Sequence, residues 1–279
     1  MRRLALLCLV LTGGCAALGG VDDGTSVSYG STSAGHLRNA VELPVLGDGY
    51  RIPEPWASRG LRYGTEELVG TIVRAGRRLA VEDAAAVLYV ADLSPRRGGP
   101  SAWHRSHQAG RDADLNFLAL DDAGAPITPS TVMLPFHDGV TAPGPDGKVR
   151  HFDVDRNWLL VRALLEDPAS EVQWLFISEP LKARLLAHAR ELGEPLEVLA
   201  RAEAILQQPG DSLPHDDHLH LRIYCPASDR SLGCRDRGPQ RWLKKTWKYG
   251  EPSAVAAAGK LPPPGPMCTV MSARVLAGR

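Results

Sequence analysis

The chain has 279 residues, and its 32 basic and 32 acidic residues leave no net charge at neutral pH. This balance excludes wholesale electrostatic wrapping of nucleic acid, so we expect no nucleic-acid partner. Hydrophobic residues make up 44% and charged residues 23%, which is typical of a globular protein with an ordinary core and excludes a multi-span membrane protein.

The first fifteen residues have the pattern of an export signal. A pair of arginines precedes an apolar run from Leu4 to Leu11, which is too short to span a bilayer. Small residues directly before Cys15 resemble a bacterial lipobox. We therefore expect residues 1–15 to form a signal segment, with an acylated Cys15 as the first residue of the mature chain. Ordinary signal cleavage and an uncleaved anchor are the alternatives, and all three place the protein outside the cytoplasm.

Three cysteines remain for the exported domain. In an oxidising compartment Cys225 and Cys234 are the natural pair, because they close a short loop. Cys268 is then left over, and we expect a buried or idle thiol there rather than a reactive one.

The first part of the chain shows few regular elements. Residues 16–60 are rich in glycine, serine and proline, which predicts an irregular lead-in rather than a separate domain. A helix is expected to begin at Thr65, whose hydroxyl can cap it, with acidic residues in the first turn. Four apolar residues of this helix are expected to face the core: Leu68, Ile72, Val73 and Leu79. The apolar run over 87–90 predicts a short strand.

The second part mixes helices and strands. A long loop rich in glycine, proline and aspartate over 120–148 is typical of a functional or mobile segment. Hydrophobic periodicity predicts three helices, over 157–165, 178–192 and 196–207, and a buried strand over 172–177. Without βαβ regularity, these elements favour an α+β fold with a small, mainly antiparallel sheet and flanking helices. Residues 250–279 have the composition of an extended tail.

Five of the nine histidines lie in two short windows. The first window contains His104 and His107. If the chain after Gly110 forms a strand, alternation places three polar side chains on the same face, which we expect to be open: Asp112, Asp114 and Asn116. A row containing two carboxylates is therefore expected near the two histidines.

Polar and apolar residues also alternate in the second window, over 215–225. On a strand, His218 and His220 project side by side, about 7 Å apart. One imidazole can then bind a metal ion while its neighbour handles a proton. A catalytic zinc ion has three protein ligands and one position for water, so one histidine and one aspartate from the first window and one histidine from the second complete a set.

Each window alone has a simpler interpretation. Any half-exposed strand alternates in this way, and an isolated His-x-His pair is more often solvated surface than a metal site. Together with His107 and Asp114 seven residues apart, and in an exported protein, the pair favours a metal site. The sequence contains no His-Glu-x-x-His, Gly-x-Ser-x-Gly, P-loop or Gly-x-Gly-x-x-Gly motif, so those chemistries have no support.

The two windows together resemble the penicillin-insensitive murein endopeptidases, which belong to the wider zinc peptidase group of lysostaphin-type and D-Ala-D-Ala peptidases and the hedgehog domain. The motifs that carry the resemblance are Ser106-His107-Gln108-x-Gly110-x-Asp112-x-Asp114 and His215-x-x-His218-x-His220-Leu221-Arg222. Three shorter matches extend it over about residues 25 to 240: Arg62-Tyr63-Gly64, Arg156-Asn157-Trp158 and Cys225-Pro226. The resemblance implies a hedgehog or D,D-peptidase-like architecture, with a zinc peptidase domain over 61–249.

The resemblance also implies roles for individual residues. Three residues are the expected zinc ligands, with His104 as a weaker candidate at the metal: His107, Asp114 and His220. His218 is the expected base beside the activated water, and His215 would support it. A downstream segment bears a second ion in the family, but here Asp146 and His151 are spaced one residue too far apart, so a second site is not expected. Asp216 and Asp217 replace neutral or basic residues, and they can orient His215 or His218.

The resulting hypothesis is a zinc-dependent endopeptidase of the periplasm that hydrolyses peptide cross-links in peptidoglycan, between D-Ala and meso-diaminopimelate. Peptidoglycan is the expected partner, and a membrane is contacted only through the lipid anchor at Cys15. Two alternatives stay open from the sequence: a D,D-carboxypeptidase that trims uncrosslinked stems, and a non-catalytic wall-binding lipoprotein. The sequence does not indicate the oligomeric state.

Overall fold

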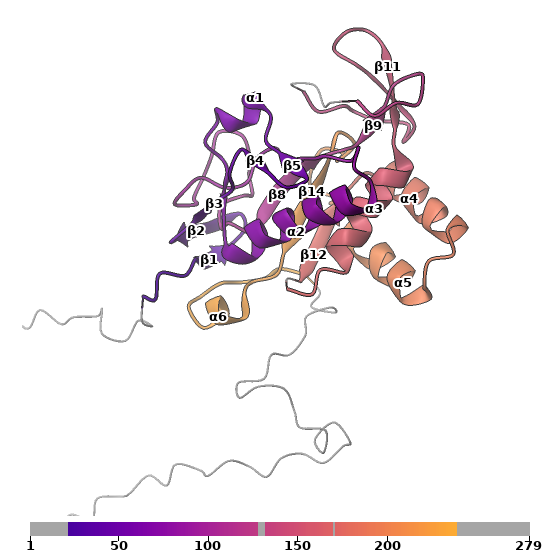
Figure 1. The fold of residues 1–279 in the computed structure, drawn as a ribbon. Coiled ribbons are helices and arrows are strands. Elements are labelled where there is room, and N and C mark those ends of the chain that lie inside the picture. The colour runs from indigo at the N-terminus through magenta and orange to yellow at the C-terminus, as the bar shows by residue number, and fades with distance from the viewer. Residues whose placement is uncertain (1–21, 128–131, 170, 239–279) are drawn as a thin grey trace, which may run out of the picture. The chain divides into compact units, whose positions relative to one another are not determined.

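The computed structural model describes residues 22–127, 132–169 and 171–238 (Figure 1). The predicted signal segment, Cys15, the tail over 250–279 and Cys268 lie outside the described residues. Within the described part, no helix is long and apolar enough to cross a membrane. The described residues combine helices with several small sheets, which confirms the prediction of an α+β fold.

A four-stranded sheet lies at the centre of the fold. Its strands follow the order β13-β12-β14-β8, with these bounds: β8 (Asp112–Asn116), β12 (Val172–Phe176), β13 (Leu206–Gln207) and β14 (His218–Ile223). Strand β14 is antiparallel to both of its neighbours, whereas β12 and β13 run parallel. The strand that carries Asp112 and Asp114 and the strand that carries His218 and His220 are therefore direct neighbours.

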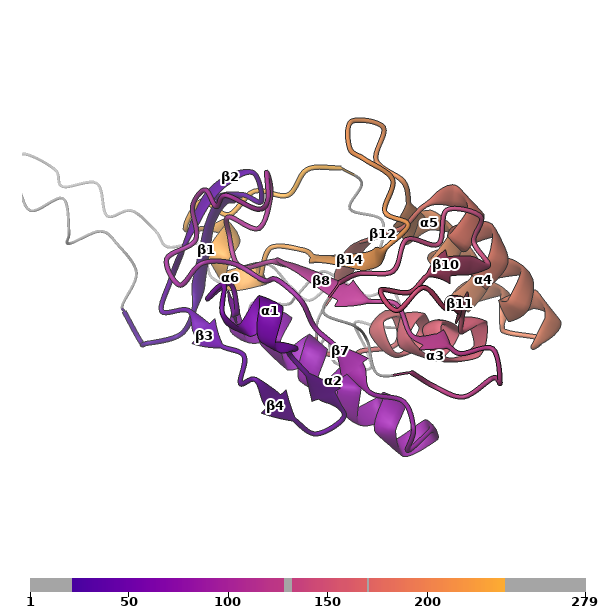
Figure 2. The same ribbon diagram turned by 90° about the horizontal axis from the view of Figure 1, so that it is seen from above.

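Four longer helices accompany this sheet (Figures 1 and 2): α2 (Glu66–Glu82), α3 (Val154–Leu165), α4 (Glu179–Glu191) and α5 (Leu196–Ile205). Helix α2 begins where the sequence predicts, because Thr65 Oγ1 accepts a hydrogen bond of 3.3 Å from Leu68 N. The odd-numbered apolar residues of β8 and β14 lie in the same buried core as α2 and α3. Of the four predicted core residues of α2, three are buried and Val73 is half-buried.

The expectation of an irregular segment over 16–60 is wrong for the residues described. This part contains five short strands and one helical turn: β1 (Val27–Ser31), β2 (Ala34–Arg38), β3 (Val41–Glu42), β4 (Leu46–Gly47), β5 (Tyr50–Arg51) and α1 (Glu54–Ala57). Strands β1 and β2 form a hairpin, while β3 and β5 pair with β6 (Tyr63–Gly64) and β7 (Leu88–Tyr89). Leu43, Ile52 and Trp56 anchor the segment in the core, but their spacing is too wide to produce a periodic signal.

Two further differences concern the second half. The helix predicted over 196–207 ends at Ile205, since Leu206 and Gln207 pair as β13 with the buried strand β12. The loop expected over 120–148 contains the strand β10 (Thr141–Pro143) and is bordered by β9 (Ala119–Leu120) and β11 (Val149–Phe152). Three phenylalanines, Phe117, Phe136 and Phe152, meet edge to face beneath it, which attaches the loop to the core.

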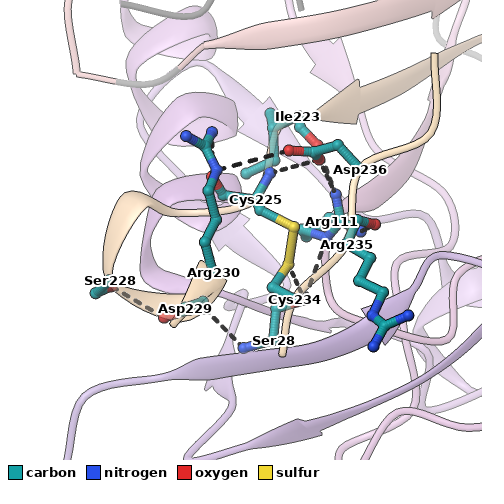
Figure 3. Close-up of a disulfide and its surroundings, with 10 residues drawn as sticks. All are labelled: Ser28, Arg111, Ile223, Cys225, Ser228, Asp229, Arg230, Cys234, Arg235 and Asp236. Carbon is teal, nitrogen blue, oxygen red and sulfur yellow. Dashed lines mark hydrogen bonds and ion pairs between the residues drawn. A yellow bond between two sulfur atoms is a disulfide. The ribbon is translucent and has the colours of Figure 1, made fainter. Parts of the chain in front are cut away.

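The predicted disulfide between Cys225 and Cys234 is present, and it encloses the short helix α6 (Ala227–Arg230) (Figure 3). Asp236, just beyond it, accepts hydrogen bonds from Cys225 N at 2.8 Å and from Arg111 Nη1 at 2.9 Å. Arg111 is buried, and it directly precedes β8. The disulfide loop thus holds together the start of β8 and the end of β14, the two strands that carry Asp114 and His220.

Candidate metal centre

The pairing of β8 with β14 brings the two histidine windows together. His220 lies opposite Asp114, and His218 lies opposite Asn116. The expectation that the carboxylate row lies on an open face is wrong, because Asp112 and Asp114 are 0% and 2% exposed. The loop that carries His104 and His107 folds over these carboxylates and buries them.

Four imidazole rings converge on the carboxylate of Asp114. Oδ1 of Asp114 lies 3.3 Å from His107 Nε2, 3.3 Å from His218 Nε2 and 3.2 Å from His220 Nδ1. His104 Nδ1 lies 3.6 Å from the other carboxylate oxygen. The structure therefore brings together all four of these histidines, which lie in two windows about a hundred residues apart in the sequence.

In three of these rings, the nitrogen that faces away from Asp114 lies beside a hydrogen-bond acceptor. His107 Nδ1 donates to the carbonyl of Leu93 at 2.9 Å, so its Nε2 carries a free lone pair. His104 Nε2 lies 2.8 Å from Asp92 Oδ2, and His218 Nδ1 lies 2.6 Å from Asp217 Oδ1. Metal-ligating histidines usually show this arrangement, in which an acceptor fixes the tautomer and the other nitrogen is left for the ion.

The backbone of His107 adopts a conformation that is uncommon for a residue with a side chain. Its φ is 63°, and its N–H donates to Asp112 Oδ2 at 3.0 Å. Asp112 Oδ1 lies 3.4 Å from His220 Nε2 and accepts a hydrogen bond of 2.6 Å from Arg222 Nε. One buried carboxylate thus contacts both flanks of the cluster.

The donor atoms of the cluster fit a divalent cation. Three of them are buried without a hydrogen-bond partner: His107 Nε2, Asp114 Oδ1 and His220 Nε2. Two sets of three side chains have ligand atoms close enough to share an ion: His104, His107 and Asp114 in one set, and His215, His218 and His220 in the other. Asp114 contacts members of both sets. Buried polar atoms that lack partners are costly, and a cation would satisfy them.

His215 lies beside the cluster and does not contact Asp114. Its ring centroid is 5.2 Å from that of His218 and 5.6 Å from that of His220. Its backbone N–H donates to Gln208 Oε1 at 2.9 Å, which fixes the segment before β14. Burial, and then the neighbouring His220 and His218, lower the pKa of His215 to about 3, so its ring is neutral at physiological pH.

Charges inside the cluster are strongly coupled. Burial alone would raise the pKa of Asp114, but His107 and His218 hold that pKa well below its usual range. Burial alone would lower the pKa of His218, yet Asp114 and then Asp217 raise it to about 10. The buried carboxylate of Asp114 is thus kept anionic and favours positive charge beside it, as a cation site requires.

Two residues of this network had no signal in the sequence. Asp92 is buried between His104 and Arg59, whose Nη1 lies 2.7 Å from Asp92 Oδ2. Trp103 is 60% exposed next to His104, with the Arg59 guanidinium over its ring at 4.0 Å. Neither residue belongs to a motif. An aspartate after a strand and an exposed tryptophan also have many ordinary explanations, so the sequence alone does not single them out.

The structure also separates residues that the sequence left ambiguous. Asp217 contacts His218, whereas Asp216 contacts the exposed His137 instead. Asp146 forms an ion pair with Arg150 at 2.8 Å, and His151 Nε2 lies 3.0 Å from Asp122. Among the described residues, Asp146 and His151 belong to neither of the two groups whose ligand atoms lie close enough to share an ion.

Comparisons with known proteins place this site in a family context. A family model described as penicillin-insensitive murein endopeptidase matches residues 28–242. A protein of that name from Klebsiella pneumoniae is 28% identical over 256 residues, which cover 87% of this chain and 84% of the relative. Another, from Escherichia coli O1:K1, is 26% identical over 286 residues, covering 95% and 96% of the two chains. The matched region contains both histidine windows.

Proposed function

The chain belongs to the penicillin-insensitive murein endopeptidase family, and we propose that it is a zinc-dependent peptidase that hydrolyses peptide cross-links in peptidoglycan. The observation that carries this proposal is the convergence of His107, His218 and His220 on Oδ1 of the buried Asp114. A solvated surface would leave these groups exposed and apart. Their burial without enough hydrogen-bond partners is typical of a metal centre.

In this proposal three side chains bind the zinc ion: His107, Asp114 and His220. They supply two nitrogens and one oxygen, the usual ligand types of zinc. His104 is a weaker candidate, since its Nδ1 is farther from Asp114 than the nitrogens of the other histidines. When bound, zinc supplies a Lewis acid that activates water and polarises the scissile carbonyl.

His218 is the proposed base. Its Nε2 points at Asp114, and its Nδ1 is held by Asp217, so the ring cannot rotate away without losing a short hydrogen bond. Asp114 is the main cause of the raised pKa of His218, so a cation bound to Asp114 would lower that pKa again. The neutral ring could then accept a proton from the attacking water and return it to the leaving amine. His215, which is neutral, packs beside this ring and supports its orientation.

We assign the cleaved bond to the cross-link between D-Ala and meso-diaminopimelate, with the periplasm as the site of action and a lipid anchor at Cys15. The murein substrate is supported by the family, and the location by the export pattern of residues 1–15. The architecture of hedgehog and D,D-peptidase domains is part of the same proposal. The paired strands β8 and β14, which bear Asp114 and His220, support it.

Digestion of purified murein tests the activity. The protein is incubated with sacculi, and the released muropeptides are identified by mass spectrometry. We expect cross-linked dimers to disappear and monomers to accumulate. Loss of only a terminal D-Ala would support a D,D-carboxypeptidase instead, while binding to sacculi without any product would support a wall-binding protein. Elemental analysis of the same sample is expected to show one zinc ion per chain.

Two substitutions separate metal binding from proton transfer. His220→Ala removes a proposed ligand, so we expect loss of both zinc and activity. His218→Ala is expected to keep zinc and lose about 100-fold or more in kcat, the usual contribution of a general base. His188→Ala in α4 is the matched control, because His188 contacts Asp155 and not the cluster. Full activity of His218→Ala would remove this residue from its role.

A further inference from the structure

A pocket lies on the N-terminal hairpin, outside the metal centre. It is open, has a volume of about 1020 Å³ and is lined by residues of β1, β2 and the loop after Ser94. The size is at the upper end of the range for small-ligand pockets. Its lining includes three arginines: Arg38, Arg96 and Arg97.

The positive charge of the pocket is only partly compensated. Asp22 forms an ion pair with Arg38. Arg96 and Arg97 are exposed and form no ion pair with any residue that the structure describes. Since the chain as a whole has no net charge, this excess is local. Paired guanidinium groups are well suited to carboxylates, which they bind by charge-assisted hydrogen bonds.

One wall of the pocket is flat and rigid. The rings of Tyr29 and His36, opposite each other in the hairpin, stack with centroids 4.4 Å apart and an interplanar angle of 6°. Arg97 is fixed by its backbone, because its carbonyl accepts a hydrogen bond of 2.9 Å from Leu37 N. The guanidinium groups therefore extend from a rigid base beside a planar surface.

The pocket is attached directly to the metal centre. Gly98, with φ of 65°, packs so closely that a Cβ there would lie 2.2 Å from the carbonyl oxygen of Gln108, the residue after His107. Gly99 N donates to that same carbonyl at 2.9 Å, and Gln108 N donates to Thr32 O in the hairpin. One loop thus carries Arg96 and Arg97 at its start and His104 and His107 at its end.

We propose that this pocket is a substrate subsite that binds free carboxylates of the murein stem peptides, on the part of the cross-linked substrate that extends away from the cleaved bond. This inference rests on the proposed function, which supplies a polymer with carboxylates at regular intervals. The pocket offers what such a ligand needs: two uncompensated guanidinium groups, a planar wall for apolar atoms, and a fixed position relative to His107.

The test compares two forms of one purified cross-linked muropeptide dimer, with the carboxyl groups away from the cleaved bond either free or converted to amides. For the wild type we expect a KM about tenfold lower for the free acid. The double variant Arg96→Gln/Arg97→Gln is expected to lose this preference while its kcat stays within about twofold of the wild type. Arg51→Gln/Arg190→Gln is the matched control, because both residues are exposed, form no ion pair with a described residue and are not part of the pocket lining.

Three outcomes would overturn the inference. The first is a pocket variant that keeps the preference for the free acid. The second is a pocket variant whose kcat/KM falls by the same factor on both substrates. The third is a pocket variant that fails only to bind vesicles of phosphatidylglycerol, which would assign the arginines to a membrane surface. If the wild type cuts neither dimer, the proposed function fails. Calorimetry then tests the subsite separately, and equal affinity of the wild type for both dimers would reject the subsite as well.

Discussion

Asp112 is not a proposed zinc ligand, but it contacts two residues that are. It is fully buried, and it contacts the backbone of His107, the ring of His220 and the guanidinium of Arg222. The hydrogen bond to His107 stabilises a left-handed backbone conformation that aims the imidazole at Asp114. Burial alone would raise the pKa of Asp112, but Arg222 and then His220 hold it well below its usual range, so the residue is a fixed anion.

Asp112→Asn is therefore expected to weaken metal binding. Loss of such supporting contacts typically costs about 10-fold to 100-fold in metal affinity, which competition with a chromophoric chelator measures. The free energy of unfolding is expected to fall by about 3 kcal/mol, since Arg222 loses its counter-charge.

Arg222→Gln is the control for that measurement. It breaks the same ion pair but leaves the contacts of Asp112 with His107 and His220 in place. We expect lower stability with metal affinity close to that of the wild type. An equal loss of affinity in both variants would show that the ion pair, and not the positioning of the histidines, is what matters.

At the scale of elements, the sequence predicted the local patterns and missed what depends on distant contacts. Alternation identified β8 and β14, and the hydroxyl of Thr65 marked the start of α2. No sequence rule gives the register between strands a hundred residues apart, although the pairing of His220 with Asp114 creates the site. Burial of Asp114 also depends on a loop that folds over it, which alternation within one strand cannot reveal.

The hairpin β1–β2 shows a different limit. Its strands are polar and glycine-rich, and only Leu37 is a buried large apolar residue. The strands are stabilised by their mutual pairing and by the disulfide loop, with Ser28 N donating to Asp229 Oδ2 at 2.7 Å. Such tertiary stabilisation leaves no hydrophobic period to detect.

Helix α2 provides a prediction about pH. Glu67 lies in its first turn, where the helix dipole favours a negative charge. Burial nevertheless raises the pKa of Glu67, and its Oε2 is buried without a hydrogen-bond partner. The folded state therefore favours the protonated form. This contribution is complete below the pKa of an unfolded glutamate, about 4.3, and is lost as pH rises through the folded-state pKa.

Glu67→Gln mimics the protonated form and is expected to stabilise the protein at pH 7 but not at pH 4. The gain is no more than about 1 kcal/mol, because the side chain is partly exposed and water screens its charge. Urea denaturation of both proteins at the two pH values measures the difference. Glu66→Gln, at an exposed residue of the same turn, is the matched control. A gain in the free energy of unfolding of Glu67→Gln that is larger at pH 4 than at pH 7 would contradict this prediction.

At the scale of the whole described domain, the disulfide loop joins parts that are distant in sequence (Figure 3). Gly30 N donates to Gly233 O at 3.1 Å, and Arg235 N donates to Gly30 O at 2.9 Å, so the loop extends the N-terminal hairpin. On its other side Asp236 neutralises the buried Arg111 and caps Cys225 N. The loop therefore connects the hairpin, which bears the proposed carboxylate subsite, to the two strands that bear Asp114 and His220.

The double variant Cys225→Ala/Cys234→Ala is expected to lower the free energy of unfolding by about 2–3 kcal/mol, the chain-entropy value for a loop of this length. Urea denaturation of the variant and of the wild type, with and without reductant, measures this loss, and the reduced wild type is expected to match the variant. The carboxylate of Asp236 accepts hydrogen bonds from the backbone N–H of residue 225 and from Arg111, and neither bond needs a cysteine side chain. The strands that bear Asp114 and His220 therefore stay joined, and the folded variant should still bind one zinc ion per chain. A stability change below about 0.5 kcal/mol would mean that these polar contacts alone hold the hairpin to the sheet, since changes of that size are usual for ordinary surface substitutions.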